Sequence, residues 1–213
     1  MELPFSVEQF FDVMRAYNET VFPVQFLFYI PVLFILRSLF RKEKKSGPNV
    51  LYILSFFWMW IGVIYHIVFF TSINKAAYGF GILFILQGIL FFVYSLRKEK
   101  LTFAYSKDIS GIAGIVLIVY ALIIYPVTGY FFGHRYPYSP TFGLPCPTTI
   151  FTWGVLLLSE KRIPYPMIII PFLWSVVGLS AAVNIRVYED FGLIISGLIA
   201  VGLIIVKNRS LKG

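Results

Sequence analysis

Long runs of mostly apolar residues alternate along the chain with short connections rich in polar residues. A transmembrane helix needs roughly 20 such residues to cross the hydrocarbon core of a bilayer, so each run predicts one span. We therefore predict an all-α fold, an integral membrane seven-helix bundle that forms a single transmembrane domain over residues 1–213. The predicted spans lie near residues 21–40, 50–70, 76–96, 109–132, 142–159, 166–185 and 187–206.

The residues before the first span, 1–20, show a different pattern. Apolar residues recur there at helical spacing, at Phe10, Phe11, Met14 and Tyr17. Ser6 followed by Gln9 fits a capping box, which marks the start of a helix. The segment therefore predicts an amphipathic helix that lies on the outer surface of the membrane.

The fifth predicted span is unusual because only its second part can be a regular helix. Residues 147–159 would form a helix about 20 Å long, too short to cross alone. Gly143, Pro145 and Pro147 interrupt the residues that precede it. Irregular backbone at membrane depth is tolerated only where protein covers it or where it lines a watery cavity. We therefore expect the outer end of this span to border a pocket.

Basic residues predict the orientation of the chain. Fourteen of the eighteen Lys and Arg lie in or beside every second connection, within residues 37–45, 97–107, 161–162 and 207–212. Cytoplasmic loops retain Lys and Arg, so the pattern predicts a multi-pass protein of the cell membrane with its N-terminus outside and its C-terminus cytoplasmic.

The composition agrees with a membrane protein. A hydrophobic content of 59%, an aromatic content of 19% and a mean hydropathy of +0.82 exclude an ordinary soluble domain. The net charge of +8 lies at the ends of spans, where anionic headgroups explain it, and we predict no nucleic-acid partner. A single cysteine excludes an intrachain disulfide and a cysteine-built metal cluster. The first residues, MELPFSVEQ, lack the basic start of a cleavable signal peptide.

A weak internal repeat indicates a parallel three-helix unit that occurs twice and is joined by the fourth helix. The matching pairs are Trp58-x-x-x-Gly62 with Trp174-x-x-x-Gly178, Phe80-Gly81 with Phe191-Gly192, and Pro23 with Pro147. Parallel repeats about an axis along the membrane normal are one plan of transporters. In layout alone this resembles the small sugar carriers and the PQ-loop proteins, which are three-one-three seven-helix small-solute carriers. Chance matches between apolar helices leave the repeat open.

On the predicted topology, polar side chains gather beneath the outer boundary. The candidate ligand-binding residues there are Tyr65, His66, Asn74, His134, Tyr136, Cys146, Thr148 and Asp190. Gln87 lies near the bilayer centre, where it either grips a neighbouring helix or contacts a solute. No Asp, Glu or Lys falls near the middle of a predicted span, which disfavours an ion-coupled pump of the familiar kind.

Three of these residues are candidate metal ligands, His66, His134 and Cys146. Imidazole and thiolate suit zinc or copper, and two histidines could also hold a haem. No pair has the short fixed spacing of a metal motif. Structural alternatives remain open for each: a helix-packing histidine, a loop hydrogen bond and a small packing thiol. Asp190 could simply favour the positive end of a helix dipole.

Several sequence segments resemble those of a known family. They are YNETVFPVQ, WMWIGVIYHIVFFTSINKAA, GHRYPYSPTFGLPCPTTIFT, LWSVVGLSAA and EDFG. Over nearly its whole length the chain resembles an uncharacterised family of prokaryotic integral membrane proteins, known only as a domain of unknown function. The resemblance implies a polytopic membrane protein. The segments that carry the resemblance contain Tyr65, His66, Asn74, His134, Tyr136, Pro137, Cys146, Pro147, Thr148 and Asp190. This chain has Lys75 where the family's pattern leads us to expect proline.

Three functions follow as hypotheses. The first is a small-solute permease with an outward-facing polar pocket. The second is a membrane-embedded enzyme or metal-binding protein that acts at the outer face through His66, His134 and Cys146. The third is a sensory or assembly subunit. The expected partners are the lipid bilayer and a small molecule, and the sequence leaves homo-oligomerisation open.

The orientation predicts the outcome of reporter fusions. A reporter that is active only in the cytoplasm should be active when fused after residue 213 and inactive when inserted at residue 134. The opposite result at residue 134 would remove the basis for an outer pocket.

Overall fold

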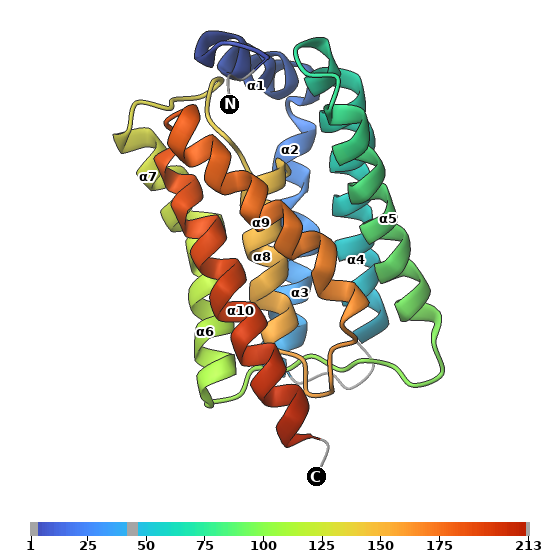
Figure 1. The fold of residues 1–213 in the computed structure, drawn as a ribbon. Coiled ribbons are helices and arrows are strands. Elements are labelled where there is room, and N and C mark those ends of the chain that lie inside the picture. Colours follow the sequence, from blue (N-terminus) through green and yellow to red (C-terminus); the bar gives the residue numbers. More distant parts are fainter. Residues whose placement is uncertain (1–3, 42–46, 212–213) are drawn as a thin grey trace.

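The computed structural model describes residues 4–41 and 47–211, and the regular secondary structure in these ranges is helical (Figure 1). Within these ranges there is no strand, only two isolated β-bridges. The α-helices are α1 (Val7–Val21), α2 (Val24–Leu27), α3 (Tyr29–Arg41), α4 (Gly47–Trp60), α5 (Ala77–Leu96), α6 (Ile109–Val119), α7 (Tyr125–Phe131), α8 (Pro145–Leu157), α9 (Pro166–Asn184) and α10 (Phe191–Ser210). The π and 3-10 segments are η1 (Ile61–Phe69), η2 (Phe70–Ser72), η3 (Tyr120–Ile124) and η4 (Tyr188–Asp190).

Six continuous helical segments are long and apolar enough to cross a membrane. They are Val24–Arg41, Gly47–Ser72, Ala77–Leu96, Ile109–Phe131, Pro166–Asn184 and Tyr188–Ser210. These helices fit a multi-pass membrane protein. Their positions match six of the seven predicted spans. The exception is the predicted fifth span, where α8 has only 13 residues.

Helix α1 lies across one end of the bundle (Figure 1). Its capping box is confirmed, because the Gln9 side chain accepts from the Ser6 backbone N–H at 2.8 Å and the Ser6 hydroxyl accepts from the Gln9 N–H at 3.2 Å. Phe10, Met14 and Tyr17 are buried on the face that meets the bundle. The helix continues to Val21, further than its amphipathic pattern indicated, and thus takes the first residue of the predicted first span.

Helix α8 is the centre of the fold, with α9 and α10 in front of it in Figure 1. Every residue of α8 except Cys146 is buried. The chain descends into the bundle before α8 begins, as the interrupted sequence indicated, and Gly143 adopts a φ of +98° that favours glycine. The helix starts at Pro145 rather than Pro147, because proline is well suited to the first turn, where its missing N–H costs nothing.

Side chains of α1, α10 and α8 itself pair with polar backbone groups at the two ends of α8. The Tyr17 hydroxyl donates to the Gly143 carbonyl at 3.2 Å, and the Thr148 hydroxyl accepts from the Gly143 N–H at 3.2 Å. At the other end, Lys207 donates to the Leu157 carbonyl at 3.3 Å, where a cation also suits the helix dipole. A short helix can therefore sit inside the bundle without unpaired backbone groups at these positions.

Two of the long segments contain a π-helical stretch, which the apolar pattern of the sequence does not indicate. η1 replaces regular helix over Ile61–Phe69, and η3 does so over Tyr120–Ile124. A π-helix turns more slowly than an α-helix, so it changes the direction in which later side chains project. Tyr65 and His66 lie within η1, and their orientation could not be read from an α-helical period.

Glycines allow α6 and α8 to approach closely. A Cβ atom added to Gly154 would lie 2.7 Å from the Gly114 carbonyl oxygen and 3.0 Å from the backbone nitrogen of Ile118. These neighbours are backbone atoms, so the contact cannot relax by a change of side-chain rotamer. Small residues at such crossings are typical of helix packing in membranes.

We expect Gly154→Ala to lower the free energy of unfolding by about 1–3 kcal/mol, the range for overpacking a close contact. Gly202→Ala in α10 is the matched control, because a Cβ atom there meets nothing within 4 Å. Thermal unfolding of both purified variants in one detergent measures the difference. Equal midpoints would show that α6 and α8 are not closely packed.

Candidate functional site

A cavity of about 140 Å³ lies near the α1 end of the bundle, between α1, η1, α8 and α9. Four predicted ligand-binding residues line it, although they come from four separate parts of the sequence: Tyr65, Asn74, Cys146 and Asp190. Most of the remaining wall is apolar and includes Phe10, Met14, Phe70, Phe80 and Trp174. A mostly apolar hollow with a few convergent polar groups is the usual form of a small-molecule site.

Asp190 is the charged group of the cavity. It is 1% exposed and precedes α10, but its side chain makes no cap to that helix. Instead its carboxylate accepts from the Tyr125 hydroxyl on one oxygen and from the Cys146 thiol, at 3.3 Å, on the other. Two neutral donors therefore hold the side chain toward α7 and α8. This contact is more specific than an interaction with the dipole of α10 alone.

Glu189, beside Asp190, makes a separate interaction. Its carboxylate lies 2.8 Å from Nδ1 of His134, and it is buried while His134 is partly covered by Phe11. Gly129 makes room for the pair, because a Cβ atom there would lie 2.9 Å from the Glu189 carboxylate. His134 thus ties the loop after α7 to the start of α10, and it does not line the cavity.

His66 lies behind the cavity wall. Its ring is fully buried among aromatic side chains, with centroid distances of 4.7 Å to Phe84 and 5.0 Å to Trp174. Neither ring nitrogen has a hydrogen-bond partner among the described residues. His66 packs against the side of Trp174 that faces away from the cavity. This agrees with the alternative of a helix-packing histidine, which the sequence left open.

The three predicted metal ligands have different neighbours. His66 packs among aromatic rings, His134 pairs with Glu189, and Cys146 pairs with Asp190. Across the part of the chain that the structure describes, no group of three His, Cys, Asp or Glu side chains is arranged to hold a metal ion. The three predicted ligands therefore do not share partners in this structure.

The other candidate residues hold structural elements in place and do not line the cavity. Gln87 donates to the Met167 carbonyl at 3.0 Å and so links α5 to α9. A hydrogen bond to a neighbouring helix is one of its two predicted roles. The Tyr136 hydroxyl lies 3.4 Å from both the Asn18 carbonyl and the Gln25 amide nitrogen. Thr148 supports the turn at Gly143.

Two residues of the site were not selected from the sequence. Trp174 lines the cavity beside the Cys146 thiol, and its indole N–H makes no hydrogen bond of normal geometry within the described ranges. Tyr125 supplies the second donor to Asp190. Trp174 did belong to the weak repeat, but its contact with the cavity depends on how α9 packs, which no sequence pattern reveals.

The cavity has a closed floor. Trp174 packs edge-to-face on Phe84 at 5.0 Å, and Phe84 stacks on Trp58 at 4.4 Å. The Trp58 indole donates to the Thr152 hydroxyl at 3.0 Å, so this column of rings is fixed to α8. In this conformation the cavity does not continue toward the opposite end of the bundle along the column.

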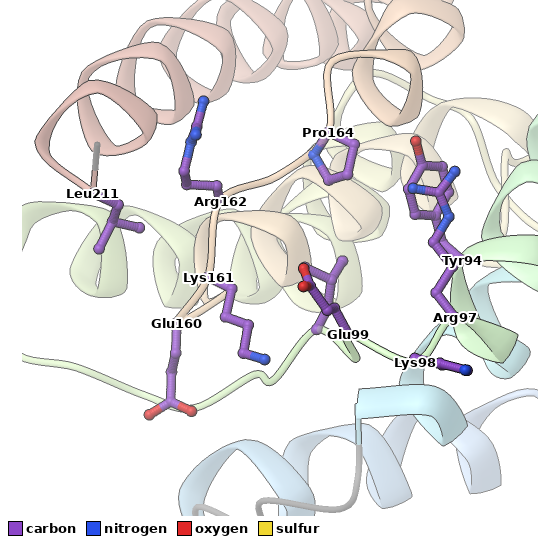
Figure 2. A pocket seen from close by; sticks show the side chains of 10 residues that line it. Tyr94, Arg97, Lys98, Glu99, Glu160, Lys161, Arg162, Pro164 and Leu211 are labelled. Atoms are coloured by element: carbon purple, nitrogen blue, oxygen red, sulfur yellow. The ribbon is translucent and has the colours of Figure 1, made fainter. Parts of the chain in front are cut away.

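A larger hollow of about 630 Å³ lies at the opposite end, and Figure 2 shows its side chains. Its charged residues are all exposed, four of them basic and two acidic: Arg97, Lys98, Lys161, Arg162, Glu99 and Glu160. Exposed loop charges of both signs do not hold a ligand in a defined pose. We therefore place the candidate site at the smaller, buried cavity.

The fold defines an all-helical protein whose apolar helices fit a multi-pass membrane protein and whose buried cavity lies toward one end. The chain belongs to the family described as "Family of unknown function (DUF6064)", which matches residues 7–212, essentially the whole chain. This confirms the resemblance to an uncharacterised family. Comparison with curated proteins and with solved structures finds no match.

The donors to Asp190 predict a measurable effect on stability. Tyr125→Phe removes one donor from a buried carboxylate and should lower the free energy of unfolding by about 1–3 kcal/mol. Tyr130→Phe is the control, because its ring is 53% exposed on the same helix. Unfolding of both variants is followed by tryptophan fluorescence. A loss that is no larger for Tyr125→Phe would contradict the proposed hydrogen bond.

Proposed function

We propose that this protein is a small-solute permease of the cell membrane, with its N-terminus outside and the cavity at Asp190 as its outward-facing solute site. The observation that carries the proposal is the cavity itself. It gathers Tyr65, Asn74, Cys146 and Asp190 from distant parts of the chain at one end of an apolar bundle. Protein cores are close-packed, and a buried carboxylate without a charged partner is costly. A hollow beside Asp190 therefore favours a binding site over a purely structural core.

The distribution of charge supports the proposed orientation. The basic connections 97–108 and 158–165 and the C-terminal end of α10 lie at the end opposite α1 (Figure 1). Retention of Lys and Arg in the cytoplasm would place that end inside. The α1 end, and with it the cavity, would then face outward, and the basic end would meet the anionic headgroups of the inner leaflet.

The seventh crossing of the proposed topology is α8 together with the irregular residues 141–144. Protein surrounds this segment on all sides, which meets the condition for non-helical backbone at membrane depth. Discontinuous helices near a solute site are common in transporters. The α8 segment would thus form one wall of the solute path as well as the middle of the bundle.

Corresponding helix contacts are consistent with the proposed three-helix repeat. Gly62 in η1 packs closely on Gly81 in α5, and Gly178 in α9 packs closely on Leu193 in α10. These contacts join the second and third helices of each proposed unit at nearly equivalent positions. A repeat of this kind allows one unit to rock against the other, so that the site opens to either side in turn.

In a permease the ring column below the cavity would be a closed inner gate. Trp58, Phe84 and Trp174 would separate during the transport cycle and expose α8 to the cytoplasm. The competing proposal is a membrane-embedded enzyme or receptor that acts only at the outer face, and the thiol of Cys146 beside the carboxylate of Asp190 favours it. In that case the column would remain closed.

A single introduced cysteine distinguishes these functions. Thr152 lies about 9 Å further along α8 than Cys146, at 1.5 Å per residue, and is buried against Trp58. In a Cys146→Ala background, a permease should allow Thr152→Cys to react with a membrane-impermeant thiol reagent added from the cytoplasmic side. Inside-out vesicles and mass spectrometry measure this reaction.

Lys98→Cys in the same background is the control, because the exposed position should react rapidly from the cytoplasmic side. Both variants must retain the unfolding midpoint of their parent. If Lys98→Cys reacts while Thr152→Cys stays unmodified from either side, the inner half does not open and the permease proposal falls.

A further inference from the structure

We infer that the cavity at Asp190 binds a small organic ammonium cation, with Asp190 as its counter-ion and the rings of Tyr65 and Trp174 as its walls. This inference rests on the proposed solute site and names the chemical class of its ligand. An ammonium group could come from a free solute or from the headgroup of a lipid in the outer leaflet. The experiments below separate these two sources.

The positive charge that would balance Asp190 is missing from its surroundings among the described residues. The carboxylate is almost fully buried, and no Lys or Arg within residues 4–41 and 47–211 forms an ion pair with it. His134 pairs with the neighbouring carboxylate of Glu189 and not with Asp190. Burying a carboxylate without a cationic partner is costly, and a bound cation would remove much of that cost.

The Asp190 carboxylate also has unused hydrogen-bonding capacity. Each oxygen of Asp190 has one donor, Tyr125 on Oδ1 and Cys146 on Oδ2. A carboxylate offers roughly four acceptor sites, so two remain for a ligand. The two neutral donors fix the direction of the carboxylate but do not neutralise it. This arrangement is suited to a ligand that carries its own positive charge.

Aromatic side chains line the cavity that contains Asp190. Tyr65, Phe80 and Trp174 border the same cavity, and the Phe80 and Trp174 rings meet edge-to-face at 5.4 Å. Aromatic faces attract cations, tryptophan most strongly, and repel anions. An anionic ligand would meet both the carboxylate and these rings, so the site discriminates against it. A neutral apolar ligand would leave Asp190 without a counter-ion.

The indole N–H of Trp174 also faces the site. This side chain is 9% exposed and lines the cavity, and its nitrogen makes no hydrogen bond of normal geometry among the described residues, where its polar neighbour is the Cys146 thiol. An unpaired N–H cannot serve the cation itself, because both are positive. It can donate to an oxygen elsewhere on the same ligand. The preferred ligand is therefore an ammonium compound that also bears a hydroxyl or ether oxygen.

The cavity volume limits the size of the ligand. A cavity of about 150 Å³ accommodates benzene in a protein core, so the 140 Å³ here holds about six or seven non-hydrogen atoms. Choline has this size and carries both an ammonium group and a hydroxyl. Its neutral carbon analogue, 3,3-dimethyl-1-butanol, has the same shape without the charge. The two compounds form a matched pair of probes.

The binding experiment uses the full-length protein in nanodiscs of phosphatidylglycerol, which contain no ammonium lipid. Choline should raise the unfolding midpoint in a concentration-dependent manner, because ligand binding stabilises the folded state. It should also slow the reaction of Cys146 with N-ethylmaleimide, because Cys146 lines the cavity that the ligand would fill. The neutral analogue should do neither. Equal effects of both probes, or no effect of choline, would overturn the inference.

Variants assign the interaction to its residues. Asp190→Asn should abolish the effect of choline, and Trp174→Phe should weaken its binding by about two- to fivefold, as expected for a weaker cation–π contact and a lost donor. Trp60→Phe is the control, because that indole pairs with Tyr17 and does not line the cavity. Unchanged binding in Trp174→Phe would contradict the assigned wall.

A second readout is independent of the choice of ligand and remains informative if Asp190→Asn folds poorly. Cys146 is the only cysteine, so its modification by a cationic trimethylammonium methanethiosulfonate and by an anionic sulfonate analogue can be compared in the wild-type protein. The cationic preference at Cys146 should exceed that at an exposed Lys98→Cys in the Cys146→Ala background. An equal or smaller preference would exclude a cation-selective cavity.

The source of the ammonium group follows from the lipid. If a headgroup normally occupies the cavity, nanodiscs of phosphatidylethanolamine should suppress the choline effect, and those of phosphatidylglycerol should not. The outcome is also separable from the permease proposal. Choline binding with an unreactive Thr152→Cys would retain the cation site and reject transport, whereas the reverse result would retain transport and reject the cation.

Discussion

The fold depends on one constraint, the burial of a helix that is too short to cross a membrane by itself. Helix α8 occupies the middle of the bundle, so the backbone that leads into it must find hydrogen bonds within the protein. Tyr17 and Thr148 supply them around Gly143, and Lys207 serves the opposite end. The position of α1 follows from this need, because its Tyr17 must reach the start of α8.

The cavity is a consequence of the same arrangement. The irregular segment before α8 ends at Leu144, which lines the cavity together with Pro145, Cys146 and residues of α1. The adjacent acids at the start of α10 then take different roles. Glu189 pairs with His134 and holds the loop after α7, while Asp190 is held beside the cavity by neutral donors. One of the two carboxylates thus has a histidine as its partner, whereas the other has only neutral donors among the described residues.

The two ends of the molecule differ in chemistry. Basic side chains are exposed at the end opposite α1, where they suit the water–headgroup boundary (Figure 2). The α1 end contains the buried carboxylate, the thiol and the aromatic walls. Between them, the column of Trp58, Phe84 and Trp174 closes the interior. A cavity above a closed aromatic layer fits the outward-facing state of the proposed permease, and the buried carboxylate of Asp190 fits the proposed cation.

The sequence alone determined the features that depend on local chemistry. Apolar run length predicted six of the long helices, the Ser6–Gln9 pair predicted the start of α1, and Gly143 with Pro145 predicted the irregular entry to α8. The sequence also placed Cys146 and Asp190 at one end. Only the tertiary structure decided that these two side chains meet, that His66 faces aromatic rings, and that Trp174 lines the cavity. Such contacts depend on the rotation and packing of helices, which the π-helical turn at Tyr65 alters and which residues far apart in the chain decide together.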